Sequence, residues 1–340
     1  MRTRMEDRVN GLDTLRFLAA CWVIMGHWGP IPITVGYSND SLITKYANGF
    51  YTGFFSAPAA VIVFFVISGF CIHFPYRNKF IVEYKSFLPS RYVRIIIPIA
   101  VTHFVDIGLN RDINEFYRII GWSIFAELCY YTVYPLLHKL SKIISWRKLF
   151  FISWIPVFYL WSKISLSSVN YPSFNLLGNT FLGLPCWILG VMLANDFDNF
   201  KNDNINKLQI WCWRIFIVFL GGILHHLALQ LIIGQPFTLN FFAIICFFWI
   251  KKEILYQKSK GKLTFLENFG KWSYSLYLLH NTIPYILQKY SFPFFGFVSN
   301  WLIYFLVTIT SSYIFYIIIE KPSHNISRKI KELLSNERKS

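Results

Sequence analysis

The sequence is poor in charged residues. Only 15% of its 340 residues are Asp, Glu, Lys or Arg, against about 25% in an average soluble protein. Acidic residues are the scarcest, with 17 Asp and Glu against 33 Lys and Arg. A soluble fold of this size needs polar side chains to cover its surface, yet 55% of the residues are hydrophobic. The composition therefore excludes an ordinary soluble domain, and its richness in aromatic residues excludes intrinsic disorder.

Cysteine motifs are also lacking. The six cysteines are scattered, without a CxxC pair or the spacing of a metal site, so we predict no disulfide framework and interpret them as apolar packing residues. No small-residue cleavage site follows the first apolar run, which we interpret as a retained helix and not as a signal peptide. There is no internal repeat and no polar stretch long enough for a soluble domain.

Long apolar runs dominate the sequence instead. Runs of about twenty residues are long enough to cross a bilayer. They predict an all-α fold, that of a polytopic integral membrane protein with about ten transmembrane helices in a single domain over 1–340. Residues 30–52 form the largest predicted outer loop, and residues 322–340 a basic cytoplasmic tail. The predicted spans are 12–29, 53–75, 92–109, 119–137, 149–162, 177–194, 212–228, 236–250, 272–288 and 296–319.

The basic residues predict the orientation of these spans. The net charge of +16 does not indicate nucleic-acid binding, because Lys and Arg fall between the apolar runs and not on one soluble face. With both termini in the cytoplasm, the inner segments hold 26 Lys and Arg, among them Arg2, Arg4 and Arg8, and the outer loops hold five. Cytoplasmic loops of membrane proteins carry such an excess. The count supports ten spans and two cytoplasmic termini.

Two ionisable residues share one face of the first span. Arg16 and His27 are eleven residues apart, close to three helical turns, and so lie about 16 Å apart along the helix axis. Ionisable side chains inside a bilayer are costly and usually face a protein interior or a water-filled cavity. Arg16 could instead reach the inner headgroups, and His27 could be a packed or interfacial histidine beside Trp28.

Two further spans carry such residues. Glu127 lies five residues beyond Trp122, roughly 7–8 Å deeper from the outer end of the fourth span. It shares the outer half of the membrane with His27, so the two side chains could meet. His280 lies near the middle of the ninth span, where a packed, hydrogen-bonded histidine is the alternative interpretation.

Arg91 and Arg94 lie at the inner end of the third span. Two arginines three residues apart share a helix face and suit bidentate contacts with phosphate. The cytoplasmic excess of basic residues would also place them there, and spacing alone does not decide between the two.

Several short motifs follow one another in a distinctive order. Arg16 and His27 lie within LRFLAACWVIMGH, and FFVISGF occupies 64–70. The later elements are Arg91, Arg94 and Pro98; Trp122, Ser123, Glu127 and Tyr131; Ser273 to His280; and Glu320, Lys321 and Pro322. Together they resemble acyltransferase family 3, integral-membrane enzymes that O-acylate bacterial surface carbohydrates. Ala60-Val61-Ile62 stands where members of this family often have Gly-Val-Asp, and the soluble esterase-like domain of larger relatives is missing.

The resemblance implies an O-acyltransferase of the bacterial inner membrane. Its co-substrate would be acetyl-CoA, without a metal, and its acceptor a hydroxyl of a carbohydrate such as the O-antigen of lipopolysaccharide, capsule or exopolysaccharide, lipid-linked in many cases. Cytoplasmic CoA would place its phosphates near Arg91, Arg94 and Arg16. His27 would act as general base on the hydroxyl, with Glu127 orienting its ring. An acyl-His27 intermediate is an open alternative. The substrate or support residues would be Ser68, Trp122, Ser123, Tyr277 and His280. The sequence does not identify the group that stabilises the oxyanion, and Ser123, Tyr277 and backbone amides are the candidates.

Two other classes of protein share some of these features. A transporter or flippase for lipid-linked sugars also has buried charges and many spans, although transporters often contain inverted repeats. An assembly subunit for such sugars would not need Arg16, His27 and Glu127 together. The sequence does not indicate an oligomeric state.

Overall fold

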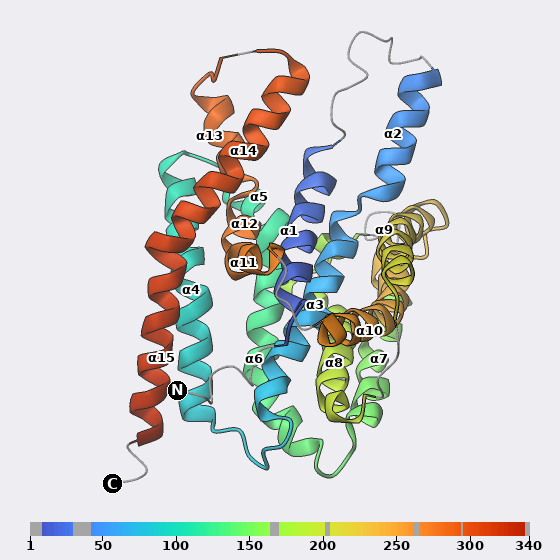
Figure 1. Cartoon of the computed structure of the whole chain (residues 1–340), viewed down its shortest axis with the longest axis vertical. Coiled ribbons are helices and arrows are strands. Elements are labelled where there is room, and N and C mark those ends of the chain that lie inside the picture. The colour runs from blue at the N-terminus through green and yellow to red at the C-terminus, as the bar shows by residue number, and fades with distance from the viewer. Residues whose placement is uncertain are drawn as a thin grey trace. The chain divides into compact units, whose positions relative to one another are not determined.

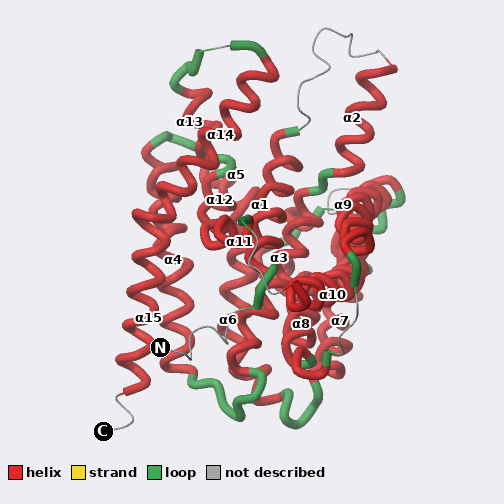
Figure 2. The backbone as a smooth tube through the Cα atoms, in the orientation of Figure 1, coloured by secondary structure: helices red, strands yellow, loops and turns green. Residues whose placement is uncertain are grey.

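The computed structural model describes residues 9–29, 42–163, 170–200, 205–260, 265–293 and 295–336, and every regular element within these residues is a helix (Figure 1, Figure 2). The predicted all-α fold is confirmed. Arg2, Arg4, Arg8 and the last four residues of the basic tail lie outside the described residues.

The first helices are α1 (Leu12–Trp28), α2 (Leu42–Phe54), α3 (Ala57–His73), η2 (Phe74–Tyr76), α4 (Tyr84–Gly108), α5 (Ile113–Phe116), η3 (Tyr117–Gly121), α6 (Trp122–Leu140), α7 (Trp146–Trp161), η5 (Tyr171–Ser173) and α8 (Leu176–Asn195). The others are η6 (Phe197–Asn199), α9 (Lys207–Gln230), α10 (Gln235–Lys260), α11 (Leu266–Phe269), η7 (Gly270–Trp272), α12 (Ser273–Leu279), α13 (Thr282–Lys289), α14 (Phe297–Phe315), η8 (Tyr316–Glu320) and α15 (Lys321–Asn336).

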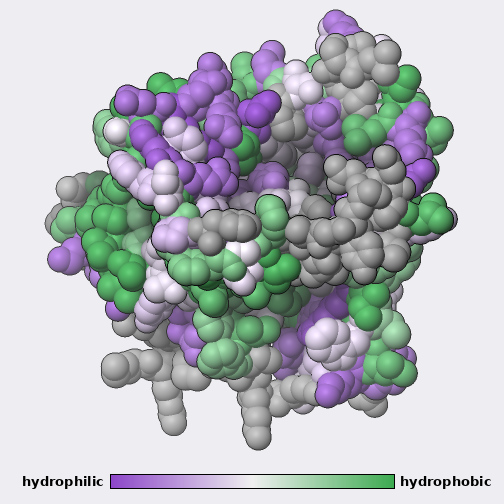
Figure 3. Space-filling model, turned by 90° about the horizontal axis from the view of Figure 1, so that it is seen from above, coloured by the Kyte–Doolittle hydropathy of each residue, from purple (hydrophilic) through white to green (hydrophobic). Residues whose placement is uncertain are grey.

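Four helical segments of the described chain are long and apolar enough to cross a membrane. Hydrophobic side chains also lie open on the molecular surface, as the green atoms of Figure 3 show. Exposed apolar surface of this extent is what a lipid environment tolerates and water does not. The structure thus supports membrane-associated helices, while the full set of ten spans and the cytoplasmic termini stay predictions. The four segments are Ala57–Tyr76, Leu176–Asn195, Lys207–Gln230 and Phe297–Ser335.

The chain forms two compact units. The first consists of Met1–Gly26, Gly53–Val82 and Trp122–Lys271, and the second of His27–Thr52, Glu83–Gly121 and Trp272–Ser340. Each unit therefore combines segments that are far apart in the sequence.

In the first unit, α3 packs closely on α8. The approach depends on glycine at two positions, because a Cβ atom on Gly69 would lie 2.0 Å from the carbonyl oxygen of Trp187. A Cβ atom on Gly190 would lie 1.8 Å from the carbonyl oxygen of Val66. The glycine of the FFVISGF motif is thus explained by helix packing: small residues let two backbones approach in a membrane.

We expect Gly190→Ala to destabilise the first unit by about 1–3 kcal/mol or more, because the added methyl group forces α3 and α8 apart. The measurement is thermal unfolding of the purified protein in detergent. Gly108→Ala is the matched control, since a Cβ atom there has no neighbour within 4 Å. Equal melting temperatures for the two variants would contradict this account of the α3–α8 contact.

In the second unit, α15 continues the line of α14 and lies beside α4 (Figure 1). The Ser327 hydroxyl of α15 donates to the carbonyl oxygen of Ser90 at 2.5 Å. The segment predicted as a basic tail is therefore a helix as far as Asn336.

The predicted span 272–288 is not one helix, because the chain turns at His280 and Asn281, between α12 and α13. In a continuous helix the ring of Pro284 would clash with the carbonyl group of residue 280, four positions earlier. This carbonyl oxygen instead accepts a hydrogen bond from Trp28 Nε1 at 2.9 Å. The prediction of an unbroken ninth span was wrong.

The predicted outer loop 30–52 also contains regular structure. Residues 42–52 belong to α2, while 30–41 lie outside the described residues. Leu42, Tyr46 and Phe50 recur at intervals of four and so share one face of this helix. The apolar spacing explains this helix, and the position of 30–52 outside the membrane stays a prediction.

Candidate functional site

Two histidines far apart in the sequence meet in the second unit. His27 lies in the last turn of α1, and His280 follows the end of α12. His27 Nδ1 lies 2.8 Å from His280 Nε2, and the rings stack with centroids 5.0 Å apart. His280 is completely buried, whereas His27 is exposed. The broken helix brings His280 to this position.

The hydrogen bonds assign the protons of the two rings. His280 Nδ1 lies 2.6 Å from the carbonyl oxygen of Tyr277, which can only accept, so this nitrogen carries the hydrogen. In the neutral ring His280 Nε2 is then an acceptor, and His27 Nδ1 must donate to it. His27 Nε2 is left with a free lone pair. A neutral histidine in this tautomer can accept a proton from a hydroxyl group.

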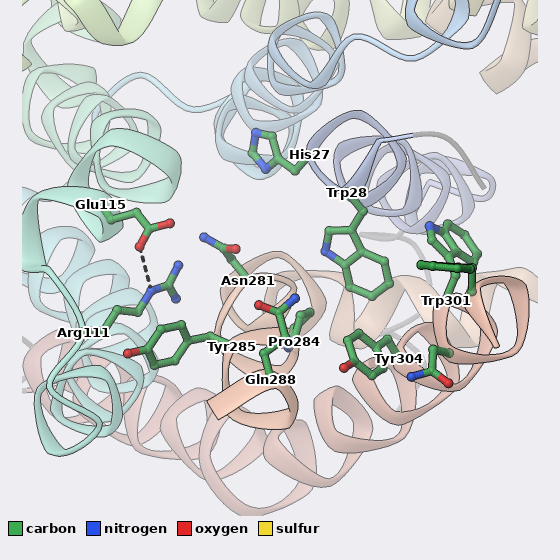
Figure 4. A pocket seen from close by; sticks show the side chains of 12 residues that line it. His27, Trp28, Arg111, Glu115, Asn281, Pro284, Tyr285, Gln288, Trp301 and Tyr304 are labelled. Carbon is green, nitrogen blue, oxygen red and sulfur yellow. Dashed lines mark hydrogen bonds and ion pairs between the residues drawn. The ribbon is translucent and has the colours of Figure 1, made fainter. Parts of the chain in front are cut away.

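His27 also lines a pocket of about 520 Å³ within the second unit (Figure 4). The size falls in the range of small-molecule sites, about 300–1,000 Å³. The lining combines aromatic rings with amide and charged groups. The other lining residues are Trp28, Arg111, Glu115, Asn281, Pro284, Tyr285, Gln288, Phe297, Asn300, Trp301 and Tyr304.

An ion-pair cluster closes one side of this pocket. The Arg111 side chain is 2% exposed and lies between two carboxylates. Its Nη1 is 3.5 Å from Asp106, and its Nε donates to Glu115 at 3.3 Å, the bond drawn in Figure 4. The guanidinium also lies over the ring of Tyr285, 5.2 Å from its centroid. Arg111 is therefore held in place, and its charge is balanced, before any ligand binds.

In the first unit, Glu127 joins a different group of side chains. Ser68 donates to Glu127 Oε1 at 2.7 Å and Tyr131 donates to the same oxygen at 2.5 Å. Arg16 Nη1 lies 3.8 Å from Asp13, and Glu127 and Tyr131 are within electrostatic range of the Arg16 side chain. The structure thus joins Ser68, Tyr131 and Glu127 in one hydrogen-bonded group, and Arg16 pairs with Asp13. His27 belongs to the other unit, so the orientation of His27 by Glu127 stays a prediction.

The start of α1 is held by Glu267, a residue that the sequence did not single out. Its buried carboxylate accepts hydrogen bonds from the backbone of Gly11 at 3.0 Å and of Thr14 at 3.1 Å. The Thr14 hydroxyl donates to it at 2.7 Å. A carboxylate suits the positive N-terminal end of a helix, and this contact fixes the first turn of the helix that carries Arg16. One acidic residue in a polar stretch has no distinctive spacing, which is why it escaped notice.

The comparisons with known proteins identify the family. A family model described as an acyltransferase domain, that of acyltransferase family 3, matches residues 9–317. The chain belongs to acyltransferase family 3. A search of curated proteins and one of solved structures gave no match.

The other predicted site residues of this acyltransferase lie outside the lining of the His27 pocket. Trp122 is buried against Phe65 and stacks on Tyr171 at 5.4 Å, contacts that indicate core packing. Ser123 is buried beside it in α6. Tyr277 packs on the ring of His280 at 5.8 Å and supplies the carbonyl group that sets its tautomer.

Arg91 and Arg94 of the acyltransferase lie half-buried in α4, within the second unit. The Arg91 guanidinium lies over the ring of Phe87, 5.5 Å from its centroid. Ser327 of α15 binds the adjacent turn at Ser90. Because Arg16 belongs to the first unit, a joint phosphate site of all three arginines stays a prediction. Among the residues that the structure describes, no three His, Cys, Asp or Glu side chains gather as metal ligands.

Sequence reasoning missed several pocket residues of the acyltransferase, notably Arg111, Asn281 and Trp301. Arg111 is one of the five basic residues of the predicted outer loops, and its spacing carries no sign of a binding role. The sequence did contain one signal, since Pro284 within the predicted span 272–288 is a residue that breaks or kinks a helix.

Proposed function

We propose that the protein transfers acetyl from acetyl-CoA to a hydroxyl group of a cell-surface carbohydrate, with His27 as the general base. The observation that carries the proposal is the His27–His280 pair: His280 accepts from His27 Nδ1, which leaves His27 Nε2 open beside a polar pocket. Membership of acyltransferase family 3 supports acyl transfer as the type of reaction. In the predicted topology the protein lies in the bacterial inner membrane with both termini in the cytoplasm, which would give CoA access from the cytoplasmic side.

The transfer follows from this arrangement. His27 Nε2 takes the proton of the acceptor hydroxyl as its oxygen attacks the thioester carbonyl. The resulting imidazolium keeps its Nδ1–H bond to His280, which strengthens when the donor is charged. Collapse of the tetrahedral intermediate breaks the carbon–sulfur bond, and His27 returns the proton to the CoA thiolate. The products are the carbohydrate ester and CoA thiol.

The test is transfer of labelled acetyl by purified protein in lipid nanodiscs. The acceptor is polysaccharide from the source cells, freed of its esters by mild alkali. We expect alkali-labile label on the carbohydrate, together with stoichiometric release of CoA. A wild-type protein that releases no CoA and labels no carbohydrate fraction would overturn the proposal.

The same assay tests the donor site. Arg91→Ala combined with Arg94→Ala should raise the KM for acetyl-CoA about ten-fold or more, because charge-assisted contacts with phosphate are each worth about 1.5–3 kcal/mol. Lys at both positions should recover only part of this loss, since Lys lacks the planar fork. Arg118→Ala, an exposed arginine of the same unit, is the control. An unchanged KM for acetyl-CoA in the double variant would show that the two arginines do not bind the donor and only contribute to the cytoplasmic excess of basic residues.

A further inference from the structure

The pocket beside His27 contains hydrogen-bond donors that have no partner. Asn281 Nδ2 and Trp301 Nε1 are both buried, and neither makes a hydrogen bond. Both residues line the pocket, and Figure 4 shows Asn281 between His27 and Arg111. A buried donor left unpaired costs about 1–3 kcal/mol. Two such donors on residues that line one cavity indicate a ligand that offers acceptor oxygens.

The charges of the pocket argue against an anionic ligand. The pocket lining contains one arginine, Arg111, and one acidic residue, Glu115, and these two side chains form an ion pair. Arg111 also lies 3.5 Å from Asp106. One cation between two carboxylates has no positive charge to spare for a phosphate or a carboxylate ligand, and adding an anion beside Glu115 would cost free energy.

The aromatic side chains supply flat apolar surfaces. Trp28 and Trp301 meet edge to face with centroids 5.8 Å apart, and Trp301 stacks on Phe305 at 5.6 Å. The Trp28 indole is also held by a hydrogen bond, since its Nε1 donates to the carbonyl oxygen of His280. A sugar ring matches such a lining, because it has C–H faces for aromatic rings and hydroxyl groups for amides.

We propose that this pocket binds one uncharged sugar residue of the acceptor, packed against Trp28 and Trp301 and hydrogen-bonded by Asn281 and the Trp301 indole. Its reacting hydroxyl lies at His27 Nε2. The inference rests on the proposed function and adds to it the binding residues and the absence of charge on the sugar. A uronic acid or a sugar phosphate does not fit this position.

The test separates the two halves of the reaction in the nanodisc assay. Asn281→Ala and Trp301→Ala should each raise the KM for the de-esterified polysaccharide about ten-fold, equivalent to about 1.4 kcal/mol. The KM for acetyl-CoA should stay unchanged. Trp301→Phe keeps a ring but removes the N–H group, and should show a smaller increase. Tyr290→Ala is the matched control, since this exposed residue follows α13 outside the pocket lining.

A competition experiment tests the charge. Methyl glucoside should inhibit transfer at concentrations at least about ten-fold lower than glucuronic acid does, since charge next to Glu115 is unfavourable. If the wild-type protein transfers acetyl and both alanine variants have an unchanged KM for the acceptor, the pocket assignment is wrong and the proposed function still holds. Equal or stronger inhibition by glucuronic acid would overturn the neutral-sugar assignment. Failure of the wild-type protein to label any carbohydrate would instead overturn the proposed function.

Discussion

His27→Ala should lower acetyl transfer to at most about a hundredth of the wild-type rate, because general-base catalysis typically contributes 10²–10⁴-fold. His27 is exposed to the pocket and contributes little to the core. The variant protein should therefore insert and accumulate at normal levels. The measurement is kcat for labelled transfer, normalised to folded protein by size-exclusion chromatography.

His27→Gln is the sharper variant. Glutamine keeps much of the size and can donate a hydrogen bond to His280, but it cannot take a proton near neutral pH. We expect it to be as inactive as the alanine variant. A His27→Gln protein that acetylates carbohydrate at close to the wild-type rate would remove His27 from the mechanism. If the variant protein accumulates at low levels but each folded molecule has the wild-type rate, His27 is a packing residue.

Replacing His280 should have the second-largest effect. His280→Leu removes the acceptor for His27 Nδ1–H, so His27 loses both its fixed tautomer and the partner of its cation. Loss of the orienting group in a serine protease triad costs about 10⁴-fold, because the wrong tautomer then dominates. His280 is itself neutral and orients a ring that can turn, so we expect a smaller loss of kcat, about ten- to a hundred-fold, with an unchanged KM for acetyl-CoA.

Two comparisons distinguish this positioning role from packing. His280→Gln places an amide oxygen near the position of Nε2 and should recover part of the lost rate, although Leu is the better apolar filler. In a His27→Gln background, His280→Leu should cause no further loss, since residues that act as a unit are not additive. Equal rates for the Leu and Gln variants, or fully additive losses, would show that His280 only fills space.

Much of the fold followed from local patterns. The helical runs at 12–29, 177–194 and 212–228 correspond to α1, α8 and α9 within a few residues, because a continuous apolar run of about this length is typical of a helix that crosses a bilayer. The break at Pro284 escaped prediction, although the cause is local. Hydropathy averages over a window in which one proline changes little.

The sequence named candidate residues and did not predict most of their partners. His27 and His280 were both candidates, but their hydrogen bond was not predicted. The bonds of Glu127 to Ser68 and Tyr131 were not predicted either, and the pairing of Glu127 with His27 stays a prediction. Spacing along one helix tells which side chains share a face. It carries no information on which residue of a distant segment lies opposite.

The sequence by itself determined the helical class, the apolar runs and the family, because composition, run length and motif order are properties of the chain that folding does not alter. Tertiary structure alone decided three other features. It joined residues 27 and 280 in one hydrogen bond, it left the Asn281 and Trp301 donors unpaired in a common pocket, and it required glycine at 69 and 190. Each of these depends on distances of a few ångström between atoms that are remote in the sequence, and such distances exist only once the helices have packed.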